Sequence, residues 1–248
     1  LLADSDFVVK AEANKADEIN TCIACNQACL DHIFSGQLTS RLVNPRACSE
    51  LELVISTTES PKYIAIIGAG PAGLATAVTA AERGHRVTLF DANDKIGGQF
   101  NLAKKIPGKE EFHETLRYYQ TQMEKLGVDV KLSQRVTVEQ LNNSDFDEVV
   151  LATGIVPRIP KMSGIDHSCV HNYIDVVTGK VEVGDRVAII GAGGIGFDVA
   201  EYLAHAGEST SQNIPAFMAE WGIDMSFNSR GGIEGMEERV TASPRTIY

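Results

Sequence analysis

A short apolar strand followed at once by a glycine-rich turn and a helix occurs twice in this chain. The first copy combines a strand at 63–67, the turn Gly68-Ala69-Gly70-Pro71-Ala72-Gly73 and a helix at 74–83. The second combines a strand at 187–190, the turn Gly191-Ala192-Gly193-Gly194-Ile195-Gly196 and a helix at 197–205. This repetition predicts an α/β fold with two Rossmann-like dinucleotide-binding units.

Each turn has the spacing G-x-G-x-x-G. The first glycine makes the tight turn, the second lets a pyrophosphate approach the backbone, and the third lets the helix pack closely on the strand. The phosphates then lie at the positive end of the helix. Asp91 ends the next predicted strand, at 86–90, and is placed to accept hydrogen bonds from an adenosine ribose. The alternative is an ordinary aspartate at a strand end.

Two tandem dinucleotide sites in one acidic chain indicate a flavin and a nicotinamide cofactor, and hence a reductase. Gly97-Gly98-Gln99 follows Asp91 closely and leaves backbone room beside a flavin. Leu151-Ala152-Thr153-Gly154 ends another predicted strand just before the second copy. An ordinary strand end with a proline linker is the alternative for that segment.

The charge and hydropathy of the chain exclude several partners. The 22 basic and 33 acidic side chains give a net charge of −11, which argues against nucleic acid and means that backbone N–H groups must hold any phosphate. No apolar run approaches the roughly 20 residues that cross a bilayer. We therefore expect a soluble, cytoplasmic protein. The chain starts at Leu1 without Met or a signal peptide, so we expect a piece of a longer protein.

Three cysteines lie within eight residues. Cys22, Cys25 and Cys29 form the pattern C-x2-C-x3-C, which suits a metal ion or an iron–sulfur cluster held by thiolates. Zinc would also accept four thiolates, and a redox dithiol would need only the first pair. Cys48 is a possible fourth ligand. Cys169 is isolated, and we predict that it is a small buried hydrophobic residue.

Five segments carry motifs of one enzyme family: residues 22–31, 42–48, 97–101, 106–112 and 207–214. They resemble bacterial-type NADPH-dependent 2,4-dienoyl-CoA reductases, which belong with trimethylamine dehydrogenase in the NADH:flavin oxidoreductase family. The similarity extends through essentially the whole chain, and the cysteine-bearing residues and 207–213 are specific to this branch. It implies an FMN-containing TIM barrel upstream and, in this chain, an iron–sulfur connector followed by two nested Rossmann-like dinucleotide-binding domains of three-layer ββα type, the second of them incomplete. It also implies that residues 1–20 end that barrel, 21–60 form an iron–sulfur connector, 61–157 bind FAD, and 158–248 are a partial NAD(P)H-binding domain.

The resemblance implies a function as well. The chain would be the electron-transfer part of an NADPH-dependent 2,4-dienoyl-CoA reductase. Hydride would pass from NADPH to FAD, and electrons would continue through a 4Fe–4S cluster to FMN, for reduction of unsaturated fatty acyl-CoA in β-oxidation. The catalytic side chains would lie in the barrel, so we assign none here. The choice of NADPH over NADH rests on the resemblance alone.

The site residues follow from the same resemblance. FAD would be bound by Gly68, Gly70, Ala72, Gly73, Asp91, Gly98, Gln99, Lys109, Val136 and Gly154. The nicotinamide dinucleotide would be bound by Gly191, Gly193, Gly194 and Gly196. The cluster ligands would be Cys22, Cys25, Cys29 and Cys48.

The chain departs from the family at one position. The family places its fourth cluster cysteine directly before Leu42-Val43-Asn44-Pro45, where this chain has Arg41, and a guanidinium cannot ligate iron. Either Cys48 replaces the missing thiolate, or a three-cysteine cluster keeps an open or non-protein ligand, or the cluster is lost. We predict a damaged or labile cluster.

Two other functions stay open at this stage. One is a free-standing FAD/NADPH module that resembles the small subunit of glutamate synthase and supplies electrons to a partner. The other is an incomplete chain that binds FAD and has no turnover. The segment 207–213, Gly-Glu-Ser-Thr-Ser-Gln-Asn, favours the dienoyl-CoA reductase branch.

Overall fold

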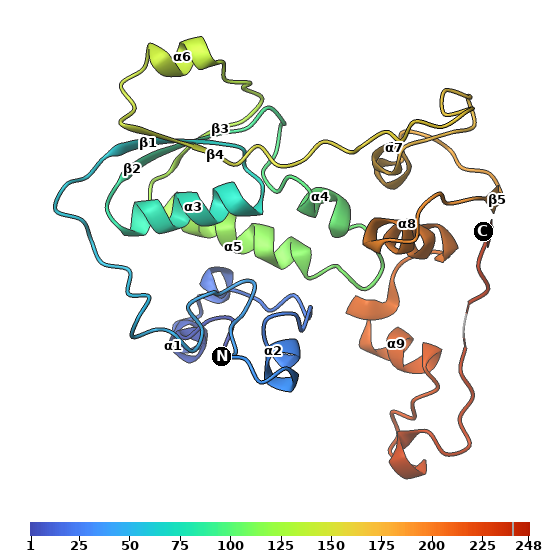
Figure 1. The fold of residues 1–248 in the computed structure, drawn as a ribbon. Helices are drawn as coiled ribbons and strands as arrows, with labels where there is room; N and C mark the ends of the chain where they lie inside the picture. The colour runs from blue at the N-terminus through green and yellow to red at the C-terminus, as the bar shows by residue number, and fades with distance from the viewer. Residues whose placement is uncertain (240) are drawn as a thin grey trace. The chain divides into compact units, whose positions relative to one another are not determined.

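The computed structural model describes residues 1–239 and 241–248, which form two compact units (Figure 1). The first unit contains Leu1–Asn101 and Glu111–Pro157, and the second contains Leu102–Glu110 and Arg158–Tyr248. The segment 102–110, which lies inside the predicted FAD-binding range, therefore packs with the second unit. Among the described residues, no helix is long and apolar enough to cross a membrane.

A four-stranded parallel sheet forms the centre of the first unit. Its strand order is β3-β2-β1-β4, with β1 at Tyr63–Ile67, β2 at Arg86–Phe90, β3 at Asp129–Lys131 and β4 at Glu148–Leu151. The middle strands β1 and β2 carry nearly continuous apolar side chains because parallel strands are covered on their faces. The sheet confirms the predicted α/β fold class.

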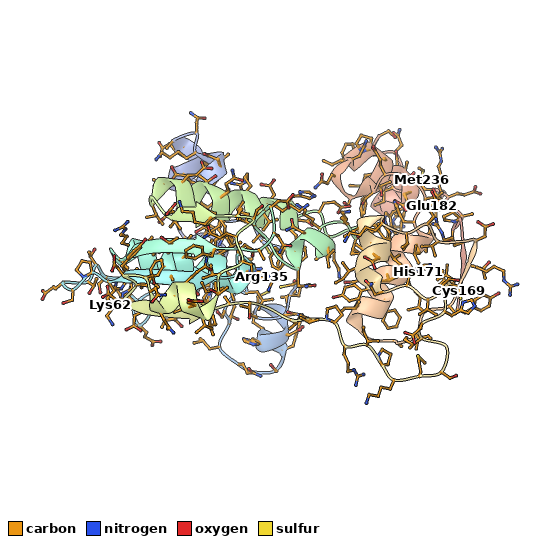
Figure 2. The ribbon with its side chains drawn as sticks, turned by 90° about the horizontal axis from the view of Figure 1, so that it is seen from above. Lys62, Arg135, Cys169, His171, Glu182 and Met236 are labelled. Atoms are coloured by element: carbon orange, nitrogen blue, oxygen red, sulfur yellow. The ribbon has the colours of Figure 1, made fainter. Side chains whose placement is uncertain are left out.

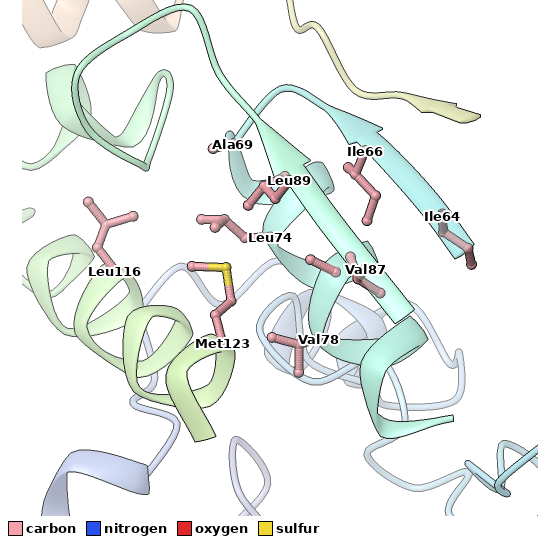
Figure 3. Packing of buried hydrophobic residues seen from close by; sticks show 10 residues of the cluster. Ile64, Ile66, Ala69, Leu74, Val78, Val87, Leu89, Leu116 and Met123 are labelled. Carbon is pink, nitrogen blue, oxygen red and sulfur yellow. The ribbon is translucent and has the colours of Figure 1, made fainter. Parts of the chain in front are cut away.

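Two helices cover one face of this sheet, α3 at Pro71–Glu82 and α5 at Phe112–Lys125 (Figure 1). Leu74 on α3 and Leu89 on β2 are completely buried. Leu116 and Met123 on α5 point toward them (Figure 3). This packing fixes the start of α3 directly after the carboxyl end of β1, where the first glycine turn lies.

The N-terminal residues pack on α5. Arg117 of α5 donates hydrogen bonds to the carbonyl oxygens of Asp17 and Ile19, the latter at 2.9 Å. The buried carboxylate of Asp4 accepts hydrogen bonds from Lys10 Nζ at 2.7 Å and from the backbone N–H of Asn20 at 2.8 Å. These contacts anchor the residues that precede Cys22. The helices here are α1 at Phe7–Glu12, η1 at Ala16–Glu18 and α2 at Leu30–Phe34.

The second unit has its own small core. Ile106, from the segment 102–110, is 4% exposed and packs with Val176 and Val177 of α7 and with Val199 and Leu203 of α8. The elements of this unit are α7 at Tyr173–Thr178, β5 at Arg186–Val187, α8 at Gly194–Ala204, η2 at Thr210–Gln212, α9 at Ile214–Glu220, η3 at Arg230–Gly232 and β6 at Thr246–Ile247. Strands β5 and β6 pair in parallel.

Two further helices of the chain are short. Helix α4 spans Phe100–Ala103, and α6 spans Val138–Asn142 with a capping box formed by Thr137 and Gln140.

Candidate dinucleotide-binding sites

The first glycine turn has no room for side chains at two positions. A Cβ on Gly68, whose φ is +111°, would lie 2.2 Å from the carbonyl oxygen of Ala152. A Cβ on Gly73 would lie 1.8 Å from the carbonyl oxygen of Gly68. Gly70 precedes the first residue of α3. The turn therefore brings the unpaired N–H groups at the start of α3 next to the end of β1, which is the geometry of an anion site.

The segment that follows Asp91 lies against this turn. The N–H of Gly97 donates to the carbonyl oxygen of Ala69 at 2.7 Å. A Cβ on Gly98, whose φ is +52°, would lie 3.0 Å from Cα of Gly70. Gly97-Gly98-Gln99 is therefore backbone beside the first turn, and its position beside a cofactor stays a prediction. Gln99 follows directly.

The Asp91 carboxylate, at the end of β2, is buried against the turn. Its Oδ2 accepts from the N–H of Ala69 at 2.6 Å, and its Oδ1 accepts from the N–H and Nδ2 of Asn93, both at 2.8 Å. A carboxylate has about four acceptor positions, so one stays available for a ribose hydroxyl. Asp91 thus supports the turn, a role that the sequence interpretation treated only as an alternative to ribose binding.

Two further segments reach the same edge of the sheet. The N–H of Gln134, two residues before Val136, donates to the carbonyl oxygen of Asp91 at 2.9 Å. Beyond β4, the N–H of Ala152 donates to the carbonyl oxygen of Ile67 at 2.8 Å, and Gly154 follows two residues later with φ +73°. The segments that carry Gly70, Asp91, Gly98, Val136 and Gly154 therefore meet at the carboxyl ends of parallel strands, where such sheets bind ligands.

The second glycine turn repeats the geometry of the first. A Cβ on Gly196 would lie 2.1 Å from the carbonyl oxygen of Gly191, whose φ is +124°. Gly193 precedes α8, and a Cβ on Gly193 or on Gly194 would meet nothing within 4 Å. The close approach of Gly196 thus shapes the turn itself, whereas Gly193 and Gly194 border open space in front of the helix.

Lys109 belongs to the second unit. Its Nζ forms an ion pair with Oδ1 of Asp198 on α8 at 2.5 Å. The structure therefore places this lysine, which the sequence assigned to FAD, beside the helix that follows the second turn. Its neighbour Glu110 accepts a hydrogen bond from Ser211 Oγ at 2.6 Å. Burial raises the pKa of Glu110, but hydrogen bonds from the hydroxyl groups of Ser209 and Ser211 outweigh burial and hold the pKa below its ordinary value. Asp198 and Ser211 are contact partners of this segment that local sequence patterns do not reveal.

Both glycine turns fit a dinucleotide. Each has a cradle that a Cβ would fill and a helix N-terminus that presents free N–H groups. The first has in addition a buried carboxylate with an acceptor position to spare. Neither needs a cationic side chain, which agrees with the acidic composition.

The four cysteines are not brought together as ligands. Cys22 and Cys25 are half-buried, Cys29 is buried and Cys48 is exposed. Nη1 of Arg41 donates a hydrogen bond to Sγ of Cys22 at 3.1 Å. Among the residues that the structure describes, no three His, Cys, Asp or Glu side chains gather closely enough to hold a metal ion. The donor groups present therefore do not fit a four-thiolate cluster.

Cys169 differs from its prediction as a buried residue. It is exposed on the second unit (Figure 2), and its Sγ lies 3.0 Å from Nδ1 of His167. Its N–H also contacts His167 Nδ1, at 3.3 Å, so a local turn and not an apolar core determines its position.

Comparisons with known proteins identify the chain's relatives. A family model described as pyridine nucleotide-disulphide oxidoreductase matches residues 62–223. The metal reductase of Desulforamulus reducens is 36% identical over 227 residues, which cover 89% of this chain and 34% of that protein. The bilirubin reductase of Mediterraneibacter gnavus is 34% identical over 207 residues, which cover 84% of this chain and 32% of that protein.

A solved structure gives the same picture. A complex of 2-naphthoyl-CoA reductase with 2-naphthoyl-CoA superimposes with a TM-score of 0.79 and 38% sequence identity, over 82% of this chain and 31% of that one. The chain thus spans about a third of the length of these relatives. The matched residues 62–223 contain both glycine turns, and the chain belongs to the pyridine nucleotide-disulphide oxidoreductase family.

Proposed function

We propose that this chain is the electron-transfer part of a cytoplasmic, NADPH- and flavin-dependent reductase. Its substrate would be an unsaturated fatty acyl-CoA such as 2,4-dienoyl-CoA in β-oxidation. The observation that carries the proposal is the presence of two glycine turns of similar geometry, each in front of a helix, in one chain of an oxidoreductase family.

The first turn would hold FAD. Backbone N–H groups at the start of α3 would receive the pyrophosphate, and Asp91 would accept a ribose hydroxyl at its remaining acceptor position. Gly98 has no side chain, so its backbone can lie close to Gly70 and leave room for the cofactor. When bound, FAD supplies the chemistry that links two-electron donors to one-electron acceptors.

The second turn would hold NADPH. The open space in front of Gly193 and Gly194 would receive the pyrophosphate at the N-terminus of α8. Acyl-CoA would bind outside this chain, in an FMN-containing barrel of the longer protein. The relationship to 2-naphthoyl-CoA reductase supports a thioester of coenzyme A as the substrate class.

Anaerobic titration of the FAD-loaded chain with NADPH tests the electron-transfer step. We expect the visible absorbance of the flavin to bleach with one equivalent of NADPH, and to bleach more slowly in the Gly193→Ala variant. If FAD binds and NADPH leaves its absorbance unchanged, the chain is a binding fragment without turnover.

The substrate needs a separate measurement on the longer protein. We expect its flavin, reduced beforehand with dithionite, to be reoxidised when 2,4-dienoyl-CoA is added, a measurement that needs no electron transfer between cofactors. A longer protein that passes electrons from NADPH to ferricyanide, but whose reduced flavin is not reoxidised by dienoyl-CoA, would contradict the substrate class and keep the electron-transfer function.

A further inference from the structure

Arg41 is an arginine whose charge has no carboxylate partner. In the described part of the chain, no salt bridge includes it. Its Nε is buried without a hydrogen bond to any described group. Its Nη1 donates to Sγ of Cys22 at 3.1 Å. The guanidinium thus contacts the cysteine segment, which we define as residues 22–29, through the sulfur of Cys22.

We propose that Arg41 blocks Cys22 as a metal ligand, so that the cysteine segment does not retain a 4Fe–4S cluster. Iron binds a thiolate through a sulfur lone pair and brings positive charge to it. A guanidinium stays charged at every working pH, and here it already occupies the sulfur's hydrogen-bonding position. Iron that approached Cys22 from this side would therefore have to displace the guanidinium, which cannot itself ligate iron.

The other thiols do not compensate for Cys22. Cys29 is buried at the start of α2, whereas Cys48 is exposed in a left-handed turn with φ +66°, its N–H bonded to Glu50. A 4Fe–4S cluster takes four cysteine ligands in its usual form. With Cys22 bonded to Arg41, only Cys25, Cys29 and Cys48 are left in the first unit, one thiol short of that set.

The inference is independent of hydride transfer from NADPH to FAD, which uses the two glycine turns. It is tested by anaerobic reconstitution of the full 248-residue chain with ferrous iron and sulfide, followed by desalting and by assay of iron and acid-labile sulfide per chain. FAD binding and circular dichroism check that each variant is folded.

Three variants accompany the unmodified chain. Arg41→Cys removes the guanidinium and adds a thiol at the same position. Arg46→Cys is the matched control, because it adds a thiol nearby and keeps Arg41. The double variant Arg41→Cys with Cys22→Ser asks whether the added thiol works together with Cys22.

We expect the unmodified chain, the Arg46→Cys control and the double variant to lose iron and sulfide on desalting. The Arg41→Cys variant should retain at least about tenfold more of both, since changes even to the outer-shell partners of metal ligands typically cost about 10–100-fold in affinity. Four tightly held irons and four sulfides in the unmodified chain would overturn the proposal. A folded Arg41→Cys variant that retains no more iron than the unmodified chain would overturn it as well.

Discussion

The carboxylate of Asp91 accepts a hydrogen bond from the backbone N–H of Ala69 at 2.6 Å. This contact joins the end of β2 to the glycine turn at the end of β1. Asp91 is therefore a structural support for the glycine turn, and the ribose contact that we propose for it would use the same carboxylate.

Replacing Asp91 by alanine should weaken both folding and FAD binding. The variant leaves the buried N–H of Ala69 without an acceptor, which costs about 1–3 kcal/mol in the free energy of unfolding. Urea unfolding of the apoprotein and an FAD titration measure the two effects. Asp94→Ala, at an exposed position, should change the free energy of unfolding by less than about 0.5 kcal/mol. Unchanged stability of Asp91→Ala together with lost FAD binding would show that Asp91 serves only the cofactor.

Two glycines of the second turn should respond differently to alanine. In Gly196→Ala the new Cβ lies 2.1 Å from the carbonyl oxygen of Gly191, so the turn must move, at a cost of about 2–3 kcal/mol. In Gly193→Ala the new Cβ meets no protein atom within 4 Å, and the loss of stability should stay below about 1 kcal/mol.

The same Cβ on Gly193 would occupy the space proposed for the pyrophosphate. We expect Gly193→Ala to bind NADPH at least about tenfold more weakly, equivalent to about 1.4 kcal/mol, as measured by fluorescence titration. Undiminished NADPH binding by this variant would move the nucleotide away from the second turn.

Lys109→Ala should leave FAD binding nearly intact, because the lysine is paired with Asp198 in the second unit. We expect the FAD affinity to change by less than about threefold, or about 0.6 kcal/mol. A double-mutant cycle with Asp198→Ala should give a coupling energy below about 1 kcal/mol, since both side chains are partly exposed. A tenfold loss of FAD affinity would return Lys109 to the flavin.

The Asp4 carboxyl should make stability fall in acid. Burial raises its pKa, but hydrogen bonds from Lys10 and from the N–H of Asn20 outweigh burial and hold the pKa below its ordinary value of 3.8. A carboxyl with a lowered pKa stabilises the fold at pH values above the unfolded pKa, and that contribution is lost as the pH falls through the folded pKa. Urea unfolding from pH 6 down to about pH 3 should show a smaller decline in Asp4→Asn than in the unmodified chain. Asp94→Asn should decline as the unmodified chain does.

Local sequence patterns were sufficient for the strands next to the first turn. The strands predicted at 63–67 and 86–90 coincide with β1 and β2, because each is an apolar run bounded by turn residues. Helix α8 begins at Gly194, three residues before the predicted start, since the glycine turn supplies the first residues of the helix. Helix α9 has no counterpart among the predicted elements, although Asn213 caps it and Pro215 lies in its first turn.

Tertiary contacts determine what the local patterns could not predict. Ile106 belongs to the core of the second unit because it packs on Val176 and Val199, far along the chain. Lys109, three residues later, therefore lies in the second unit as well. The contact between Arg41 and Cys22 likewise joins residues that are 19 apart. The spacing of the cysteines suggested a shared cavity, but spacing carries no information about which side chain approaches each sulfur.

The parallel order β3-β2-β1-β4 has a consequence for how the chain folds. Strand β1 pairs with β2 after one short crossover, whereas Tyr63 meets Asp147, next to β4, across 84 residues. Closing so long a loop is entropically costly, so this pairing should form late and slow folding. During synthesis, strand β1 of the first unit therefore has an unpaired edge until β4 leaves the ribosome, and the risk of aggregation is greatest in that interval.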